Sequence, residues 1–257
     1  MTQPRNSQNR LTARSIVAST LLGTDPPRLP ARVLVQAGEL FGVTEGTTRV
    51  ALSRMVTSGE LAADDGWYEL AGTHLLARQA RQQASRAAAT RDWDGSWQLV
   101  VVTVERRAAS ARAELRDELT RARLGELREG VWLRPDNLDT ALPTIVGEQA
   151  TTLRAFDVAP ETAMHLWDID GWQARARELH AAMKPLVGRL ERGDTDALAD
   201  GFVTSAAVLR HFQADPLLPD VLLPARWPGR ALRADYDRFD RAYRAVLRDW
   251  FRANTAS

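Results

Sequence analysis

Apolar and polar residues in the first seventy positions follow the pattern of three short helices and a hairpin. The expected helices cover residues 12–22, 30–41 and 44–58. Gly42 stands where a helix end favours positive φ, and Thr44 is a good N-cap for the third helix. Residues 61–70 form two strand-like segments around the turn Asp64-Asp65-Gly66. This order predicts a winged helix-turn-helix, and an ordinary small helical bundle with a hairpin is the alternative.

The middle of the chain alternates between strand and helix patterns. Residues 97–104 are β-branched and mostly apolar, which is typical of a strand buried on both faces. A helix is expected over residues 106–124, because small and apolar residues recur there every three or four positions. Further strands are expected at residues 130–134 and 153–158. Strand, helix, strand, helix, strand indicates a ferredoxin-like α/β domain.

From Asp170 to its end the chain has the pattern of a helical domain. Asp170 can cap a first helix, and Asp194 or Asp196 can begin a second. The last helix carries a large apolar stripe: Leu232, Tyr236, Phe239, Tyr243, Val246 and Trp250. This stripe is either a dimer contact or a surface that packs inside its own domain. We therefore expect an α+β protein in four parts: a winged helix-turn-helix (11–73), a connecting helix (74–92), a ferredoxin-like domain (93–168) and a helical C-terminal domain (169–257).

Composition and charge narrow the possible functions. The chain has no cysteine, which excludes disulfides, thiolate zinc sites and cysteine nucleophiles. Its 34 basic and 33 acidic residues nearly balance, so any nucleic-acid binding needs a local patch. The first fifteen residues lack the apolar core of a signal peptide, and no apolar run is long enough to span a membrane. These features predict a cytoplasmic protein that needs no cofactor.

Four sequence segments together resemble the phenylacetic-acid-degradation repressor family, the PaaX-like regulators. They are Arg49 with Val50-Ala51-Leu52-Ser53-Arg54-Met55, then Trp93-Asp94-Gly95-Ser96-Trp97, then Val131-Trp132-Leu133-Arg134-Pro135, and finally Asp215-Pro216-Leu217-Leu218-Pro219 with Leu222-Leu223-Pro224 and Trp227-Pro228-Gly229. The resemblance covers nearly the whole chain. It implies a dimeric transcriptional repressor that binds double-stranded operator DNA. It also implies release by an aryl-CoA or acyl-CoA thioester such as phenylacetyl-CoA, in control of a catabolic operon.

The third helix supplies the candidate DNA-binding residues. At about 100° per residue, Leu52 is the centre of the buried face, with Thr48, Ala51, Met55 and Val56 beside it. The candidates for DNA contact lie on the other side or at the helix start: Thr44, Gly46, Thr47, Arg49, Val50, Ser53, Arg54 and Thr57. A guanidinium can pair with a guanine edge, and an apolar side chain can contact a thymine methyl. The alternative is that the arginines are simply solvated.

Two flanking regions carry charge that could affect DNA binding. Carboxylates at the wing tip, Asp64 and Asp65, would be repelled by phosphate, so this wing departs from what a DNA-contacting wing requires. Glu45 near the start of the third helix suits the helix dipole better than a base contact. The basic N-terminal arm, with Arg5, Arg10 and Arg14, either adds phosphate contacts or has no role.

A CoA effector would need arginines beside an apolar slot. The candidates are Arg106 and Arg107 after the first middle strand, with Trp132 and Arg134 on the second. Trp97, Trp167 and Trp172 could also line an aryl slot, and core packing is the alternative for each tryptophan.

Enzyme chemistry finds little support in the sequence. The four histidines, at positions 74, 165, 180 and 211, have no spacing typical of metal ligands, so no metal site is expected. A metal-dependent nuclease on the ferredoxin-like domain stays open as an alternative, with Glu105 as its one candidate ligand. A scaffold that oligomerises without binding DNA is a third alternative. We expect a regulator that is not an enzyme.

Overall fold

The computed structural model describes residues 12–22, 24, 26–71, 90–104 and 108–255. Its chain divides into two compact units, each built from segments that are far apart in sequence. The N-terminal unit comprises Met1–Gln83, Leu179–Val208 and Arg233–Ser257, and the central unit comprises Ala84–Glu178 and Leu209–Leu232. Helices and antiparallel sheets together confirm the predicted α+β class.

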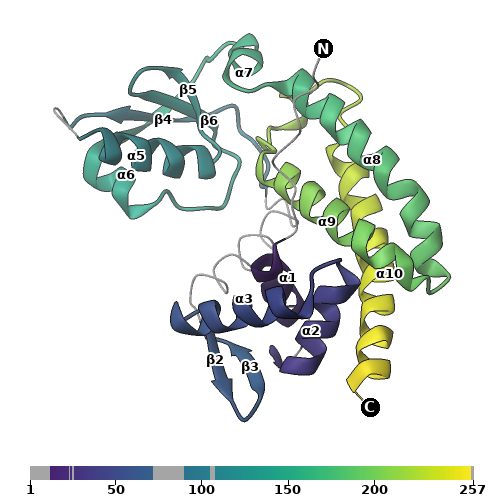
Figure 1. The fold of residues 1–257 in the computed structure, drawn as a ribbon. Coiled ribbons are helices and arrows are strands. Elements are labelled where there is room, and N and C mark those ends of the chain that lie inside the picture. The colour runs from purple at the N-terminus through teal and green to yellow at the C-terminus, as the bar shows by residue number, and fades with distance from the viewer. Residues whose placement is uncertain (1–11, 23, 25, 72–89, 105–107, 256–257) are drawn as a thin grey trace, which may run out of the picture. The chain divides into compact units, whose positions relative to one another are not determined.

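The N-terminal unit begins with three helices and a small sheet. Its elements are α1 (Ala13–Leu22), β1 (Arg28–Pro30), α2 (Ala31–Leu40), α3 (Glu45–Thr57), β2 (Leu61–Asp64) and β3 (Trp67–Leu70). The three strands are antiparallel in the order β1-β3-β2 (Figure 1). Sequence analysis predicted the three helices and the hairpin, but it missed β1. That strand is only three residues long, too short for alternation of polar and apolar residues to reveal it.

Left-handed backbone conformations occur at the turns where the sequence predicted them. Gly42 follows α2 with a φ of 74°, and the Val43 N–H donates to the Gly38 carbonyl at 2.8 Å. Asp65 and Gly66 have φ values of 44° and 76°. Two consecutive positive φ values give the tight hairpin turn that matches the twist of its flanking strands. The acidic turn is therefore built into the shape of the β2–β3 hairpin, the predicted wing.

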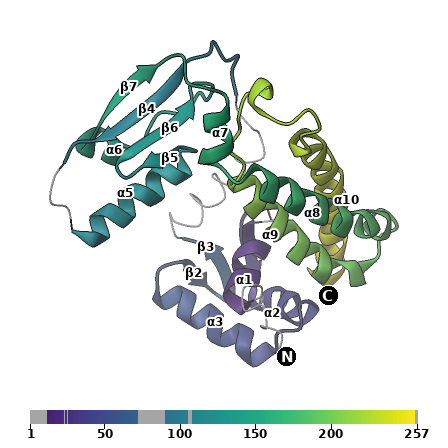
Figure 2. The same ribbon diagram turned by 90° about the horizontal axis from the view of Figure 1, so that it is seen from above.

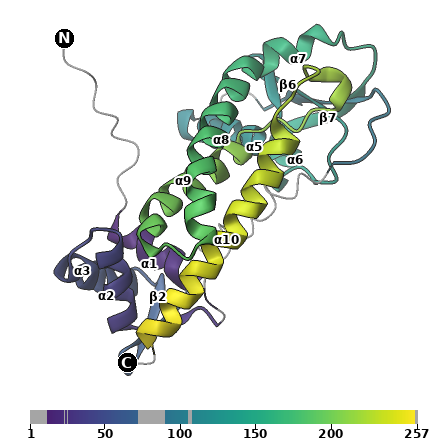
Figure 3. The same ribbon diagram turned by 90° about the vertical axis from the view of Figure 1, so that its right-hand side faces the viewer.

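The last helix, α10 (Gly229–Thr255), completes the core of the N-terminal unit. Its Phe251 is only 8% exposed and belongs to the same hydrophobic cluster as Leu21, Leu34 and Leu52. Earlier along α10, the Tyr236 hydroxyl hydrogen-bonds to Ser205 at 2.8 Å. Figure 3 shows the length of α10, which ends beside the first helices.

The apolar stripe of α10 is buried within this chain. Most of its members are buried: Leu232, Tyr236, Phe239, Tyr243 and Val246. Gly201 in α9 (Leu198–Gln213) lies so close to Tyr243 that an added Cβ would stand 2.8 Å from the ring. The interpretation of the stripe as a dimer contact is therefore wrong, and packing inside the chain is the correct alternative. Helical spacing groups these residues on one face but cannot say what covers that face.

The central unit contains a four-stranded antiparallel sheet with two helices. Its elements are β4 (Trp97–Val102), α5 (Ala109–Arg121), β5 (Gly125–Arg128), β6 (Val131–Pro135), α6 (Thr144–Gln149) and β7 (Ala150–Ala155). The strand order β5-β6-β4-β7, with this order of elements along the chain, is that of a ferredoxin-like domain. Residues of α5 and α6 pack on one face of the sheet around Val100 and Trp132 (Figure 2).

Two details of this sheet differ from the sequence prediction. The last strand covers residues 150–155 rather than 153–158, because it pairs along the whole of β4, with Val102 opposite Ala150 and Trp97 opposite Ala155. The pairing partner therefore sets the bounds of β7, which hydrophobicity alone placed too late. The prediction also missed β5, a short strand whose register shifts between Glu126 and Arg128, so its side chains do not alternate regularly.

The remaining helices follow the predicted C-terminal pattern, with one addition and one correction. Asp170 was expected to cap the first of them, but it lies inside the first turn, and the Asp168 side chain accepts the hydrogen bond from the Gly171 N–H at 2.9 Å instead. A short helix that the sequence did not reveal, α7 (Glu161–Leu166), precedes α8 (Ile169–Glu191), and Pro185 lies inside α8. The Asp194 side chain accepts a hydrogen bond from the Asp196 N–H at 3.0 Å, so Asp194 caps the short 3₁₀ helix Thr195–Ala197 before α9. A second 3₁₀ helix covers Asp220–Leu222. Among the described residues, no helix has the length and hydropathy needed to cross a bilayer.

Candidate nucleic-acid interface

Close contact between α2 and α3 determines how α3 is held. Gly38 of α2 faces Thr48 of α3, and a Cβ added to Gly38 would lie 2.3 Å from the Thr48 Oγ1. Thr48 is fully buried, and its hydroxyl donates to the Thr44 carbonyl at 3.2 Å. The Thr44 hydroxyl in turn accepts a hydrogen bond from the Thr47 N–H, which confirms Thr44 as the N-cap of α3. Sequence reasoning missed the role of Gly38, because a glycine inside a helix gives no sign of its neighbour.

One face of α3 packs into the unit and the other faces solvent. Thr48, Leu52 and Met55 are buried, as the helical period predicts. All eight candidates for DNA contact are exposed: Thr44, Gly46, Thr47, Arg49, Val50, Ser53, Arg54 and Thr57. Val56 was expected beside the core, but it is 36% exposed, because it lies at the edge of the buried stripe close to the end of α3. The exposed face is therefore mostly polar, with two apolar side chains, Val50, which is 51% exposed, and Val56 near the end of the helix.

The two arginines of this face differ in their partners. The Arg49 Nε donates to the Glu45 Oε1 at 2.7 Å, so Glu45 pairs with Arg49 as well as lying in the first turn of α3. Arg54 forms no ion pair with any residue that the structure describes. An ion pair must open before Arg49 can contact a phosphate or base, whereas the guanidinium of Arg54 needs no such step. Arg54 is therefore the arginine of α3 best prepared for a new contact.

The wing combines acidic, basic and aromatic side chains. Arg28 on β1 approaches Asp64 at 3.3 Å, and its guanidinium lies 5.4 Å from the centre of the Trp67 ring. Such a cation–π contact orders the arginine over the exposed indole. Arg28 thus offsets part of the acidic charge of the wing turn, although the Asp64 side chain remains largely exposed.

The basic arm is only partly described. Arg5 and Arg10 lie outside the described residues, while the Arg14 Nε donates to the Glu60 Oε2 at 2.8 Å. The pKa of the Glu60 carboxyl lies below its ordinary value. The main cause is a hydrogen bond from the Ser58 hydroxyl, and the Arg14 guanidinium adds to it. Arg14 is therefore engaged at the end of α3 in this structure.

The arginines predicted to bind the effector are only partly described by the structure, and the one that is described is buried. Arg106 and Arg107, like the nuclease candidate Glu105, lie outside the described residues. Arg134 is 2% exposed, and its guanidinium donates to the carbonyls of Ala122 and Thr140 and to the Gln98 side chain. Burial lowers the pKa of Arg134. These bonds tie the end of α5 to the sheet, so Arg134 serves the fold in this structure.

The structure does not gather the tryptophans into one slot. Trp132 packs on the helix-covered face of the sheet, whereas Trp97 and Trp167 belong to a cluster that also contains α7 and residues 218–222. The Trp172 ring stacks on the rings of His211 and Trp227, with ring centres 4.1 Å and 4.3 Å away. Strand alternation sends Trp97 and Trp132 to opposite faces, which separate strand predictions cannot show.

Three consecutive segments of the chain match known protein families. Residues 12–74 match the family described as PaaX-like protein, residues 90–162 match the PaaX protein central Cas2-like domain, and residues 167–253 match the PaaX-like protein C-terminal domain. The chain belongs to the PaaX-like family, whose members are regulatory rather than enzymatic.

The similarity to a solved structure extends along almost the whole chain. Rv0674 from Mycobacterium tuberculosis, described as an uncharacterized protein, is 41% identical, with a TM-score of 0.78. The match covers 93% of this chain and 99% of that one. No curated protein matches the sequence. The likeness supports the fold and the family, and through the family a role as a transcriptional regulator.

Proposed function

We propose that this protein binds a specific double-stranded DNA sequence through α3 and thereby represses transcription. The observation that carries the proposal is the exposed face of α3, which is polar except for Val50 and Val56 and includes Arg54. A recognition helix enters the major groove and contacts base edges mainly through its N-terminal half. Gly46, Thr47 and Val50 lie in that half of α3, and Ser53 and Arg54 extend the reading surface by one further turn, while the buried residues of α3 hold the helix in place.

Each exposed side chain has a role that its chemistry allows. Arg54 pairs with a guanine edge, where a guanidinium can donate two hydrogen bonds. Ser53 and Thr47 donate to bases or phosphates, and Val50 contacts a thymine methyl. The acidic wing contributes less, because Asp64 and Asp65 would face the negative backbone of DNA. Sequence preference thus comes from α3 rather than from the wing.

The family supports a more detailed version of this function. The protein acts as a homodimer that represses a catabolic operon, and an aryl-CoA or acyl-CoA thioester releases it from DNA. A dimer presents two copies of α3 to half-sites about 10 base pairs apart, or a multiple of that spacing. Because the stripe of α10 is buried inside the chain, the dimer must use another surface.

Selection from a pool of double-stranded DNA with a randomised centre tests the proposal. At physiological salt, the protein should enrich one motif with two half-sites. A variant with Ser53→Ala and Arg54→Ala should lose the enrichment, while Arg121→Ala, which removes an exposed arginine of α5, should keep it. If the intact protein enriches no motif, sequence-specific DNA binding is wrong.

A further inference from the structure

The two described sheets have four edge strands, and three of these are protected against pairing with a further strand. In the N-terminal unit, β1 is three residues long and ends at Pro30, and β2 is four residues long and ends at Asp64. In the central unit, β5 has four residues, and its register shifts between Glu126 and Arg128. Short length, proline, charge and irregular register all hinder the addition of another strand.

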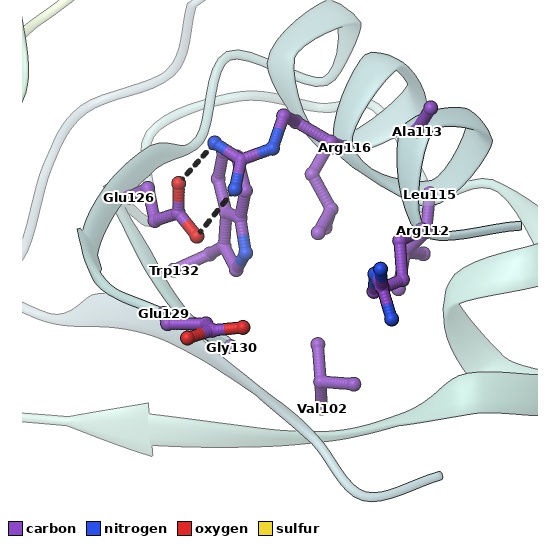
Figure 4. Close-up of a pocket in the computed structure, with 10 residues that line it drawn as sticks. Val102, Arg112, Ala113, Leu115, Arg116, Glu126, Glu129, Gly130 and Trp132 are labelled. Carbon is purple, nitrogen blue, oxygen red and sulfur yellow. Dashed lines mark hydrogen bonds and ion pairs between the residues drawn. The ribbon is translucent and has the colours of Figure 1, made fainter. Parts of the chain in front are cut away.

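A charged pair also lies beside β5. Figure 4 shows the Arg116 guanidinium of α5 hydrogen-bonded to the Glu126 carboxylate, with one bond from Nη2 to Oε1 at 3.2 Å. The central carbon of this guanidinium lies 5.5 Å from the centre of the Trp132 ring. The edge of the sheet at β5 is therefore both irregular and charged, which makes it unsuitable for a second strand.

The fourth edge strand, β7, lacks this protection. It is six residues long, contains no proline and pairs with β4 without interruption from Ala150 to Ala155. Figure 2 shows β7 at the outer margin of the sheet, beside β4. Its four central residues are exposed, and threonine, which supplies two of them, favours strands: Thr151, Thr152, Leu153 and Arg154. A long, regular and exposed edge is a template for pairing with another strand.

The one charged side chain of β7 is already balanced inside the central unit. The Arg154 guanidinium donates hydrogen bonds to the Asp94 carboxylate and, at 2.9 Å, to the Ser96 hydroxyl. Its central carbon also lies 5.3 Å from the centre of the Phe156 ring. Asp94 and Ser96 directly precede β4, the inner neighbour of β7. These contacts therefore draw the guanidinium toward β4, so its charge does little to protect the outer edge.

The pairing with β4 shows which backbone groups of β7 face outward. The Thr103 N–H donates to the Gln149 carbonyl at 3.1 Å, and these two residues continue the register of β4 and β7. Because hydrogen-bonded pairs alternate along an antiparallel ladder, Leu153 directs its N–H and C=O toward β4. The N–H and C=O groups of Thr152 and Arg154 point the other way, toward the outer edge. Among the described residues, no backbone hydrogen bond outside the β4 ladder involves them.

We propose that β7 pairs antiparallel with β7 of a second copy of this chain, about a two-fold axis beside Leu153. In this register Thr152 of each copy lies opposite Arg154 of the other, so that each outward N–H meets an outward carbonyl. Leu153 is the one large apolar side chain of β7 and is 50% exposed in the single chain. The two copies of Leu153 lie directly opposite each other, where apolar cross-strand pairs stabilise a sheet.

A second copy suits this edge better than an unrelated strand, because the pattern of donors and acceptors on β7 complements itself about a two-fold axis. Pairing uses up the β7 edge of both copies, and the other edges are protected, so assembly stops at two chains. This inference rests on the proposed function for the expectation that two copies act together, and it names the surface that they share. The apolar stripe of α10 is not available for that purpose, since it is buried within the chain.

Engineered cysteines test the register directly, because the chain has no cysteine of its own. Mild oxidation of full-length Leu153→Cys should give a covalent dimer on a non-reducing gel. Opposite residues of a non-hydrogen-bonded pair have Cα atoms about 4.5 Å apart, a separation that a disulfide can bridge. The matched control is Thr151→Cys, at an exposed position on the same face of β7. Its two copies would lie about 13 Å apart along the strands, so it should not cross-link.

Charged variants test whether the dimer in solution depends on β7. Light scattering of the intact protein without DNA should give the mass of two chains. Leu153→Lys should raise the dissociation constant about tenfold or more, because like charges placed together at an interface are strongly unfavourable. Leu153→Glu should have the same effect, and an equimolar mixture of the two variants should restore the dimer. Val221→Lys, at a side chain 78% exposed in the same unit, should leave the dimer unchanged.

Three results would overturn the pairing: a monomeric intact protein, a dimer that neither charged variant weakens, or a cross-link from Thr151→Cys in place of Leu153→Cys. The outcome for DNA is separate. Enrichment of a motif with two half-sites by a dimer that Leu153→Lys does not weaken would keep the proposed function and overturn the β7 pairing. A dimer that depends on Leu153 but enriches no motif would keep the pairing and overturn sequence-specific DNA binding.

Discussion

The helices α3 and α10 are both amphipathic, yet they use their apolar residues in opposite ways. On α3, a narrow buried stripe of Thr48, Leu52 and Met55 leaves Val50 in solvent. On α10, the long aromatic stripe, including Tyr236 and Phe239, is buried inside the chain. A large apolar stripe therefore does not indicate an interaction surface here, because the folded chain already covers it. The exposed Val50 on the mostly polar face of α3 is a better indicator of such a surface.

The two helices also share one hydrophobic core. Phe251 near the end of α10 packs in the cluster that contains Leu52 of α3. The last helix therefore stabilises the core from which α3 presents its outer face. Mutations in α10 should act on stability, and mutations on the outer face of α3 should act on DNA.

Removing the Phe251 side chain should have the largest effect. Phe251→Ala leaves a cavity in the core of the N-terminal unit and should lower its free energy of unfolding by about 3–5 kcal/mol. Urea denaturation monitored by circular dichroism and tryptophan fluorescence measures the loss. The neighbouring Arg252→Ala, at a largely exposed side chain, should change stability by no more than about 0.5 kcal/mol. A small effect of Phe251→Ala would show that α10 does not support this core.

Separating α2 from α3 should have the next largest effect. Gly38→Ala places a Cβ against Thr48 and should destabilise the unit by about 1–3 kcal/mol, because the two helices must move apart. Adding Thr48→Ala removes the hydroxyl and methyl groups that cause the clash, so the double variant should recover part of the loss. Thermal unfolding of the three variants measures this coupling. If the stability losses of Gly38→Ala and Thr48→Ala simply add in the double variant, the close packing of α2 against α3 is contradicted.

Arg54→Ala should weaken DNA binding without affecting the fold. If Arg54 contacts a guanine, the loss at the cognate site should be about 1–3 kcal/mol, with relaxed preference at one base pair. Shift assays on single-base variants of the selected site measure both quantities. Equal losses on cognate and random DNA would assign Arg54 to a phosphate, and no loss on either would remove it from the interface.

Neutralising the wing should have the smallest effect. Asp64→Asn with Asp65→Asn removes like-charge repulsion, so DNA affinity should stay unchanged or rise slightly at low salt. Asparagine also tolerates the positive φ of position 65, which limits any change in the turn. Fluorescence anisotropy with labelled DNA at two salt concentrations measures the effect. Clear weakening with an intact fold would mean that the wing carboxylates contribute to binding.

Features that depend on local sequence patterns were predicted better than features that depend on long-range packing. The exposed face of α3 could be assigned because a helix repeats every 3.6 residues. Gly42 indicated the end of α2, and Thr44 indicated the start of α3. The short strands β1 and β5 were not predicted, because neither is long and regular enough to show alternation of polar and apolar residues. The helical period gathered the aromatic residues of α10 on one face but could not identify their partner. The faces on which Trp97 and Trp132 lie likewise depend on the register between β4 and β6, which cannot be predicted from either strand alone.

The ratio of affinities for the selected DNA site and a scrambled site tests the central claim most directly. At physiological salt, the intact protein should prefer the selected site by a factor of about 10³ or more. Replacing Val50, Ser53 and Arg54 together by alanine should lower this ratio at least tenfold, with unchanged thermal stability. A ratio near one for the intact protein, or a ratio that survives the triple substitution, would contradict sequence recognition by α3.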